Sequence, residues 1–363
     1  MDPQFIAKTV ITVIFGTIIL ALVGIFLGLL YKGIDRKLSA HMQGRIGPPI
    51  VQPFRDIRKL FTKENIIPEN AIPWVFNLAP LIGLIGAISI MLYIPLVPQL
   101  DGVGLVPLIP FGGDLILILY LLMIPSIAMV IGGFASGSPY ATVGAQREMT
   151  TMIAYEFPLA IIIVTIAWKL STVIETAGGM AQNSFALSTI AATPIWNAVG
   201  PLGFFGCIIL LLVLLIVTPA ELSKIPFDSP EAETEIAGGL LTEYSGRNLG
   251  IFYLTDAVKT LVMGTIIVAI FFPYNLSPLL GLESIPAIIV DIVFFLIKLF
   301  LVILFSVTLI RVAVARLKID QIVYTYWIPL TLLSLVGLIL LMWDKTLMEH
   351  FGLQTIGQML GFL

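Results

Sequence analysis

Long apolar segments and short polar ones alternate along the whole chain. Eight of the apolar segments reach the ~20 residues that an α-helix needs to cross a bilayer. They lie roughly at residues 6–31, 72–96, 112–134, 150–171, 202–218, 249–272, 284–310 and 323–342. The first has only Lys8 near its start and lacks a small-residue cleavage site, so we expect a retained helix and not a signal peptide. The pattern predicts an all-α polytopic membrane protein in which residues 1–363 form a single integral membrane domain.

Basic residues occupy alternate connections between these segments. Lys or Arg occurs in the connections 32–71, 135–149 and 219–248 and in the turn after residue 310, whereas 97–111, 172–201 and 273–283 contain neither. Connections rich in Lys and Arg stay in the cytoplasm. We therefore expect both termini outside a plasma membrane, with the chemistry in the two long cytoplasmic loops, 32–71 and 219–248.

The loop 32–71 predicts a helix that lies along the membrane surface. After Gly47-Pro48-Pro49, apolar residues recur at helical spacing with basic residues between them. The apolar positions are Ile50, Val51, Phe54, Ile57, Leu60 and Phe61, and the basic ones are Arg55, Arg58, Lys59 and Lys63. Such a helix lies at the interface with its bases near the lipid head groups. It could equally form a docking surface for a water-soluble partner or the rim of a cavity that opens sideways to lipid.

The loop 219–248 is acidic. Its carboxylates are Glu221, Asp228, Glu231, Glu233, Glu235 and Glu243. Asp228 and Ser229 suit a helix N-cap, and Pro230 suits the first turn, so we expect a helix that opens here with Glu231 and Glu235 on one face. A solvated loop at the membrane surface and a buried proton relay both fit these residues, because charged groups are costly in hydrocarbon unless they have a function.

Several ionisable residues fall inside the apolar segments, where each is a functional candidate. Glu148, Tyr155 and Glu156 share a helical face in the fourth segment. We expect Asp256 to pair with Lys259, and Asp291 with Lys298, while Lys169 reaches towards the head groups. Buried ion pairs can be purely structural. Acids in the fourth segment, the 219–248 loop and the sixth segment could nevertheless form a chain of titratable sites, which favours the relay.

Composition narrows the function classes. Of the 363 residues, 58% are hydrophobic and 11% charged, and the net charge of −3 does not indicate a nucleic-acid partner. Cys207 is the only cysteine, and there are two histidines. A disulfide framework, an Fe–S or zinc ligand set and a pair of haems are therefore excluded in this chain. We expect it to hold no cofactor and no metal, and to have no catalytic centre of its own.

Several motifs agree with one family. They are Asp35-Arg36-Lys37, Gln43-Gly44-Arg45-Ile46-Gly47-Pro48, Lys59-Leu60-Phe61, Ala220-Glu221, Pro226-Phe227-Asp228, Glu231, Glu233 and Glu235, Glu243-Tyr244, Arg311 and Ala315-Arg316-Leu317-Lys318-Ile319-Asp320-Gln321. In order and spacing they resemble the complex I subunit that connects the redox arm to the membrane arm. The sequence from Pro230 to Phe252, with Asp256 and Lys259, looks more like the corresponding subunit of energy-converting membrane-bound hydrogenases, formate hydrogenlyase and ferredoxin-dependent complexes than like that of quinone-reducing complex I. Asp35 stands where the family usually has Glu.

The resemblance implies that this chain and its partner subunits have different tasks. This chain would be a subunit, without a redox cofactor, of an ion-translocating oxidoreductase. Soluble subunits with Fe–S clusters, and in one branch a nickel–iron-type centre, would dock on its cytoplasmic face. Small and antiporter-like subunits would lie beside it in the membrane with lipid. The implied relay residues are Glu148, Glu156, Glu221, Asp228, Glu231, Glu233, Glu235, Glu243, Asp256, Lys259 and Asp291, and the implied docking residues are Asp35, Arg36, Lys37, Arg45 and Arg316.

Two other functions remain open at this point. The chain could form the quinone chamber of a complex I relative that reduces quinone. It could also be a stand-alone secondary ion transporter, although the first and last four segments show no internal repeat of the kind that many transporters have. The sequence leaves open the electron acceptor, the choice between proton and sodium ion, the source organism, and the number of partner subunits.

Overall fold

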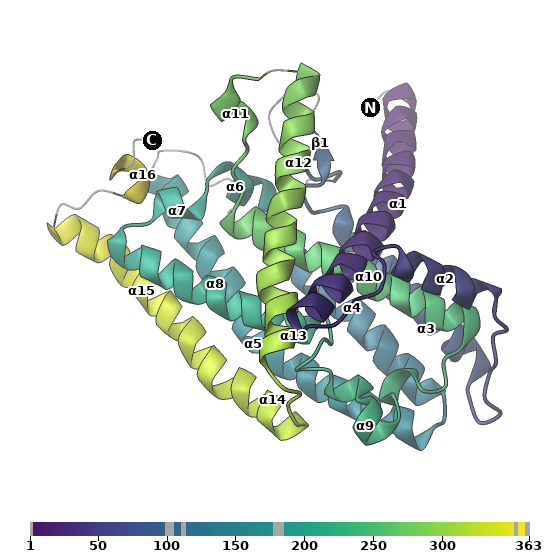
Figure 1. The fold of residues 1–363 in the computed structure, drawn as a ribbon. Coiled ribbons are helices and arrows are strands. Elements are labelled where there is room, and N and C mark those ends of the chain that lie inside the picture. Colours follow the sequence, from purple (N-terminus) through teal and green to yellow (C-terminus); the bar gives the residue numbers. More distant parts are fainter. Residues whose placement is uncertain are drawn as a thin grey trace.

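The computed structural model describes residues 3–98, 105–109, 114–176, 185–282, 284–351 and 355–359. Within these ranges the chain is almost entirely helical (Figure 1). The long helices are α1 (Pro3–Met42), α3 (Pro73–Met91), α4 (Asp114–Ala135), α5 (Pro139–Thr176), α8 (Pro201–Glu221), α10 (Gly246–Phe271), α12 (Ser284–Ile303) and α15 (Thr331–Phe351). The short helices are α2 (Gln52–Thr62), α6 (Leu187–Ala192), α7 (Ile195–Ala198), α9 (Glu233–Ile236), α11 (Ser277–Leu280), α13 (Leu309–Ala313), α14 (Ile319–Thr325) and α16 (Ile356–Met359).

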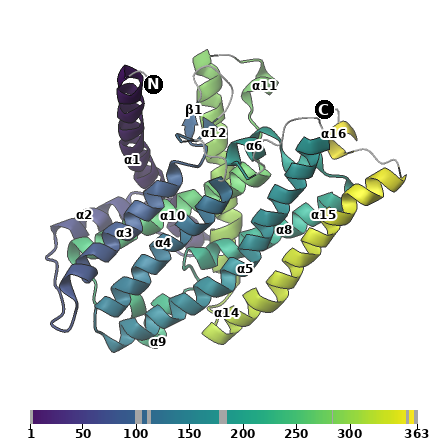
Figure 2. The ribbon, with the colours of Figure 1, turned by 180° about the vertical axis from the view of Figure 1, so that it is seen from behind.

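Two-residue strands β1 (Val97–Pro98) and β2 (Leu105–Val106) pair in antiparallel fashion at the end of α3. In the described part of the chain, eight helices are long and apolar enough to cross a membrane. The protein is therefore a multi-pass, all-α membrane protein, as the hydrophobic pattern predicts. Both labelled chain ends, the β1 strand and α11 lie towards one side of the bundle, and α9 and α14 lie towards the other (Figures 1 and 2).

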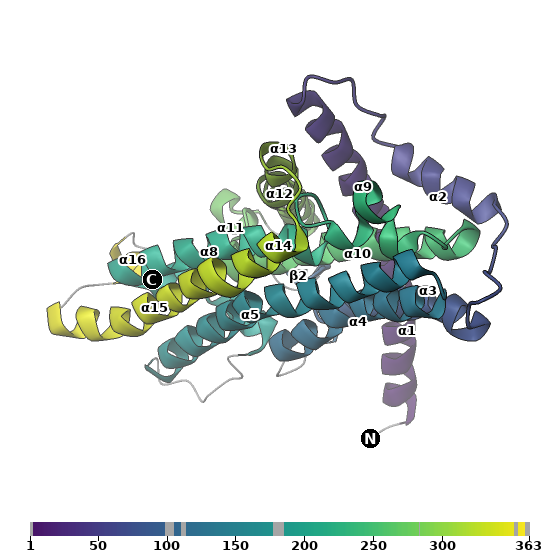
Figure 3. The same ribbon diagram turned by 90° about the horizontal axis from the view of Figure 1, so that it is seen from below.

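The helix α10 is the centre of the bundle. In its most apolar stretch 94% of the residues are buried, against 22% for α1. It packs against α1, α3, α2 and α12, while α15 packs along α8 and α5 (Figure 3). Glycines permit the closest of these approaches: a Cβ on Gly28 of α1 would overlap the backbone carbonyl of Ala257 on α10. The charged residues of α10 are thereby placed in the middle of the molecule.

Three predicted boundaries differ from the structure. α1 runs on to Met42, so Lys32, Asp35 and Arg36 are helical residues and not loop residues. α5 begins at Pro139, so Glu148 lies well inside it. α13 and α14 are extended by π-helical turns at Leu304–Thr308 and Tyr326–Leu330, so the seventh and eighth spans are longer than the apolar runs. In each case the helix continues through polar residues that have ion-pair or hydrogen-bond partners.

The predicted amphipathic helix is present as α2. Phe54 and Ile57 pack on a small core formed by Leu29, Leu254 and Ala257. Arg55, Arg58 and Lys59 are exposed. The helix thus lies with its apolar face on α1 and α10.

The predicted helix after Asp228 is wrong in extent. Ser229–Glu231 form a single 3-10 turn, and α9 is four residues long. Asp228 makes no capping hydrogen bond, because its carboxylate binds Arg316 instead. Ala237 and Gly238 then have left-handed backbone conformations that end α9. Glu231 therefore faces inward and Glu235 is exposed, so the two do not share one helical face.

Candidate functional site

Lys259 is the centre of a buried polar cluster, which we call the inner cluster: Ser126 on α4, Glu148 and Tyr155 on α5, Glu221 on α8, and Lys259 on α10. The Lys259 ammonium lies 2.8 Å from Glu221 Oε1 and donates a 2.8 Å hydrogen bond to Ser126 Oγ. Tyr155 is within hydrogen-bonding reach of Glu221, and Ser126 of Glu148. All of these residues are at least 95% buried. The cluster thus joins four spans inside the bundle.

Glu156 continues this cluster towards the side of the bundle. It follows Tyr155 on α5 and is only half-buried. Glu221 and Lys259 are close enough to act on its charge. Among the described residues, Glu148 Oε1 and Glu156 Oε1 have no hydrogen-bond partner. Each leaves an acceptor open for a water molecule or a proton, since buried polar atoms rarely stay unpaired.

Asp256 is the centre of a second cluster, the outer cluster, formed with Lys32 and Lys224. Its Oδ2 accepts from the Lys32 ammonium at 2.5 Å and from the Lys224 ammonium at 2.6 Å. Lys32 also lies 5.2 Å from the centroid of the Tyr253 ring. One carboxylate thus holds two ammonium groups, one from the end of α1 and one from the loop after α8. The predicted Asp256–Lys259 pair is wrong, because each residue pairs elsewhere.

The loop 222–245 folds back onto α5 and so brings Lys224 and Glu231 beside α10. Ser223 has a left-handed backbone, and Lys224 N donates to Pro219 O at 2.8 Å, which turns the chain sharply after α8. Gly144 of α5 lies so close to the loop that a Cβ there would be 2.6 Å from Leu240 N and 2.9 Å from Pro230 O. A larger residue at position 144 would push the loop away from α5.

A narrow cavity of about 30 Å³ separates the inner cluster from the outer cluster. Its lining includes Glu221 and Lys259 of the inner cluster, Lys224 and Asp256 of the outer cluster, and Glu231. This is room for a water molecule or two. A wider cavity of about 300 Å³ follows, and Ser223, Lys224 and Glu231 line both. Polar side chains therefore follow one another from the loop surface to α5.

Glu231 lies at the junction of the two cavities. Burial raises the pKa of its carboxyl to about 7, the positive charges of Lys224 and Lys32 oppose this, and the negative charges of Asp256 and Asp228 reinforce it. A carboxyl with this pKa, outside the membrane spans, is suited to proton exchange near neutral pH.

Ion pairs between distant segments form the rim of the wider cavity. Asp228 accepts from Arg316 Nε at 2.9 Å and Nη2 at 2.6 Å, and this hydrogen bonding raises the pKa of the Arg316 guanidinium further. Asp35 accepts from Thr308 Oγ1 at 2.7 Å and from Arg311 at 3.0 Å. These pairs fix α1, the loop after α8 and the turn after α13 relative to one another.

The remaining predicted residues are more peripheral. Arg36 pairs with Asp56 of α2 at 3.0 Å, and Arg147 pairs with Glu235 at 2.5 Å. Glu243 is half-buried next to Tyr244, whose ring stacks on Phe76. The residues Glu233, Lys37 and Arg45 are exposed. The structure does not bring these residues into either cluster.

Asp291 lies elsewhere in the fold. Its carboxylate accepts hydrogen bonds from Leu276 N at 3.1 Å, Ser277 N at 2.9 Å and Ser277 Oγ at 2.7 Å. Lys298 donates instead to the carbonyls of Phe272 and Tyr274. The predicted Asp291–Lys298 pair is therefore wrong. Both residues hold the connection between α10 and α12.

Sequence reasoning missed several partners. In the sequence, Lys32 and Lys224 can be recognised only as basic residues of predicted cytoplasmic loops. Ser126 lies in an apolar segment, and nothing in the sequence marks it as a partner. The prediction that Lys169 reaches the head groups is wrong, because this residue is 98% buried and pairs with Asp344 of α15 at 2.8 Å. Asp344 also accepts from Gly200 N and Gly203 N at the start of α8, so it caps that helix.

Within the described ranges, no three His, Cys, Asp or Glu side chains are grouped so that they could hold a metal ion. Cys207 is buried within α8. The chemistry that this arrangement offers is therefore the movement of charge between carboxylates and ammonium groups that lie close together in a low-dielectric interior.

The family model described as NADH dehydrogenase matches residues 15–342. The chain belongs to this family. It is similar to the NADH-quinone oxidoreductase subunit designated H of Syntrophotalea carbinolica, with 34% identity over 276 residues, 72% of this chain and 78% of that protein. The corresponding protein of Bacillus cereus is 33% identical over 288 residues, 76% of this chain and 78% of the relative.

A solved structure is similar to this chain over most of its length. It is a chain of the membrane-bound sulfane sulfur reductase, an archaeal respiratory membrane complex, and it superposes with a TM-score of 0.72 at 27% identity. The match covers 91% of this chain and 99% of the solved one. Both clusters lie within residues 15–342, the part of the chain that the family model matches.

Proposed function

We propose that this chain is the membrane subunit of a respiratory oxidoreductase that couples electron transfer in docked soluble subunits to ion movement in neighbouring membrane subunits. The single observation that carries the proposal is the succession of ionisable groups from the loop surface through Glu231, Asp256 and the Lys259–Glu221 pair to Glu148 and Glu156. Family membership and the likeness to two respiratory complexes support it.

The rim of the wider cavity is the proposed docking side. It carries charged groups from three segments distant in sequence: Asp35 and Arg36 on α1, Asp228 after α8, and Arg316 before α14. A soluble Fe–S subunit that changes charge on reduction would act on these groups across a short distance, because the wall behind them is of low dielectric. The exposed residues Lys37, Arg45 and Glu233 extend this surface.

Protonation and charge shifts would then pass inward. Glu231 stands where the cavities meet, and its pKa of about 7 suits proton exchange at the loop. Asp256 and Lys259 lie on the same helix and belong to different clusters, so a change at the outer cluster acts on the inner one through α10. Glu156, half-buried at the side of α5, is the proposed exit towards an antiporter-like subunit.

The quinone-chamber function is the second candidate. The relatives named for NADH-quinone oxidoreductase favour it, and the 300 Å³ cavity is at the lower limit of small-molecule pockets. Its lining of paired charges suits water and ions better than an aromatic ring, and the 30 Å³ cavity beyond it has no room for a quinone head group. We therefore favour the branch without a quinone, with a hydrogenase-like or sulfur-reducing partner.

The test is a set of Glu→Gln variants in the whole complex. Glu221→Gln and Glu156→Gln keep the shape of the side chain and remove a titrating group. We therefore expect electron transfer to continue while the ion gradient falls about tenfold or more. Glu69→Gln, at an exposed position outside both clusters and the wider cavity, is the matched control and should retain the gradient. Assembly is followed on native gels. Normal gradients in both Glu221→Gln and Glu156→Gln would contradict the relay, and protection of the wider cavity by a quinone analogue would favour the second candidate.

A further inference from the structure

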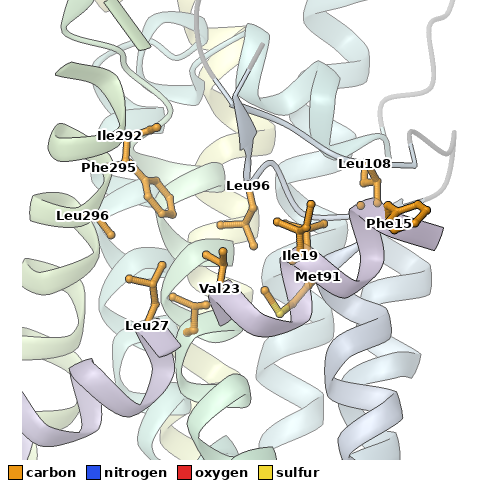
Figure 4. Close-up of a pocket in the computed structure, with 13 residues that line it drawn as sticks. Phe15, Ile19, Val23, Leu27, Met91, Leu96, Leu108, Ile292, Phe295 and Leu296 are labelled. Atoms are coloured by element: carbon orange, nitrogen blue, oxygen red, sulfur yellow. The ribbon is translucent and has the colours of Figure 1, made fainter. Parts of the chain in front are cut away.

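An apolar cavity of about 660 Å³ lies between the middle parts of α1 and α12, and it shares no lining residue with the two polar cavities (Figure 4). Phe15, Ile19 and Val23 of α1 stand on one side, and Ile292 and Phe295 of α12 on the other. The thirteen lining residues all have apolar side chains or are glycine. Such a lining does not bind water, which needs polar partners.

The crevice is closed at one end and open at the side. The Tyr31 hydroxyl donates a 2.8 Å hydrogen bond to Leu296 O, and Asp35 binds Thr308 and Arg311 further along, so α1 and α12 are held together at that end. Towards their N-terminal ends the two helices diverge (Figure 1).

Exposure of the lining shows which way the cavity opens. Phe15, Ile19 and Val23 are 62%, 60% and 46% exposed, and they form the mouth. Leu20 and Phe295 are 7% and 8% exposed and form the floor. Since α1 and α12 are both membrane spans, the mouth faces the hydrocarbon of the bilayer and not water.

The dimensions select the occupant. The lining on α1 runs from Phe15 to Leu27, about 18 Å along the helix and slightly more than one leaflet of a ~30 Å hydrocarbon core. A cavity of about 660 Å³ is in the size range of pockets that hold one drug-sized molecule, and so it admits one hydrocarbon chain about as long as a leaflet is thick.

We propose that this crevice is a binding site for the acyl chain of one membrane lipid, which enters sideways from a single leaflet and lies between α1 and α12. Buried interiors contain few voids larger than a water molecule, since atoms that line a void lose their dispersion contacts. The chain supplies these contacts to Leu20 and Phe295. It acts as a spacer between α1 and α12 on the side away from the Asp35–Arg311 ion pair.

The test uses the whole complex in membranes that contain a phospholipid with a photoreactive diazirine in its acyl chain. Label is expected on the floor residues Leu20 and Phe295, which annular lipid hardly reaches because they are only 7% and 8% exposed. Val23→Phe narrows the mouth and should lower floor labelling about tenfold, the change expected when about two methylene groups leave an apolar lining. Val336→Phe on α15 is the matched control, since Val23 and Val336 are 46% and 44% exposed.

Three results would overturn the proposal. The first is floor labelling in the wild-type complex no higher than at lipid-facing positions such as Val336. The second is competition for the label by a decyl quinone, which would assign the crevice to an isoprenoid-type tail. The third is a helix of a neighbouring subunit seated in the crevice in a density map of the complex. The wild-type measurement stands on its own if Val23→Phe does not assemble.

Discussion

At the scale of single residues, Asp256 and Lys259 show that tertiary contacts, and not spacing in the sequence, decide which ion pairs form. They lie three positions apart on α10, yet Asp256 binds Lys32 and Lys224 while Lys259 binds Glu221. An Asp–Lys pair at this spacing on an isolated helix would be worth only a few tenths of a kcal/mol. The bundle instead offers each group a partner from another helix in a buried setting, where breaking a pair costs far more.

Glu231 should make the stability of the complex depend on pH near neutrality. Its folded pKa of about 7 lies above the ordinary value of 4.5. The stabilising contribution of this carboxyl is therefore complete below about pH 4.5 and is lost as the pH rises through about 7, on the order of 3 kcal/mol at most. The thermal midpoint of the purified complex, measured from pH 5 to 8, should fall less steeply in Glu231→Gln than in the wild type.

Glu233→Gln is the control for this measurement, because Glu233 is exposed two residues away. Its pH dependence should match that of the wild type. An infrared band from a protonated carboxyl that titrates near pH 7 in the wild type, and is missing in Glu231→Gln, would be a second readout. A wild-type slope retained in Glu231→Gln would contradict the assignment.

The acids of the two clusters stand out in the sequence, but most of their partners do not. Glu148 and Asp256 are conspicuous because carboxylates are rare in apolar segments, and Glu221 because it belongs to an acidic loop. Their partners come from segments far away in sequence: Lys32 is separated from Asp256 by 224 positions. No periodicity encodes such a contact. Local rules pair Lys259 with Asp256 and Lys298 with Asp291, and both pairings are wrong.

At the scale of elements, the Lys169–Asp344 pair connects three spans away from the two clusters. Lys169 comes from α5, Asp344 from α15, and the accepted N–H groups from the start of α8. Lys169→Met leaves the buried Asp344 without its ammonium partner and should destabilise the fold by about 3–5 kcal/mol. Loss of assembled complex on native gels and a lower thermal midpoint are the measurements.

The double variant Lys169→Met with Asp344→Leu separates charge from packing. Replacing both members of a buried pair by apolar residues is often close to neutral. We therefore expect the double variant to recover a large part of the stability that Lys169→Met loses, although the start of α8 then lacks its acceptor. A double variant less stable than Lys169→Met would show that the pair is kept for its net stabilisation.

The contact between α1 and α10 depends on Gly28. Gly28→Ala would place a methyl group against the backbone carbonyl of Ala257, which cannot move without moving α10. We expect a loss of about 1–3 kcal/mol and weaker assembly. Gly16→Ala on the same helix is the control: its Cβ would meet the Leu108 side chain at 2.9 Å, which is a flexible neighbour. Equal thermal midpoints for the two variants would contradict this account.

The elements themselves were largely predictable, because runs of ~20 apolar residues have few alternatives in a bilayer. All eight spans and the amphipathic α2 follow from pattern. The extent of α1 was not predictable, since helices that continue past the hydrocarbon need partners such as Asp256 and Arg311 for their charges. The expected helix after Asp228 failed for the same kind of reason, because Arg316 takes the capping carboxylate.

At the scale of the whole molecule, the orientation predicted from basic loops can be measured directly. Cys207 is fully buried, so the wild-type chain should give little background with a membrane-impermeant maleimide. Leu279→Cys, at a position that is 81% exposed on α11, should react in intact cells. Glu233→Cys should react only after permeabilisation in a detergent that releases the soluble subunits. The reverse order would place the termini in the cytoplasm.

The central position of α10 has one further consequence. This helix carries Asp256 of the outer cluster and Lys259 of the inner cluster on a single rigid backbone, and nearly every residue around them is enclosed. One additional residue inserted between positions 256 and 259 would rotate one end of the helix against the other by about 100°. Neither end could then keep its ionic partners, so insertions and deletions at this point should be tolerated far less than substitutions of the apolar side chains nearby.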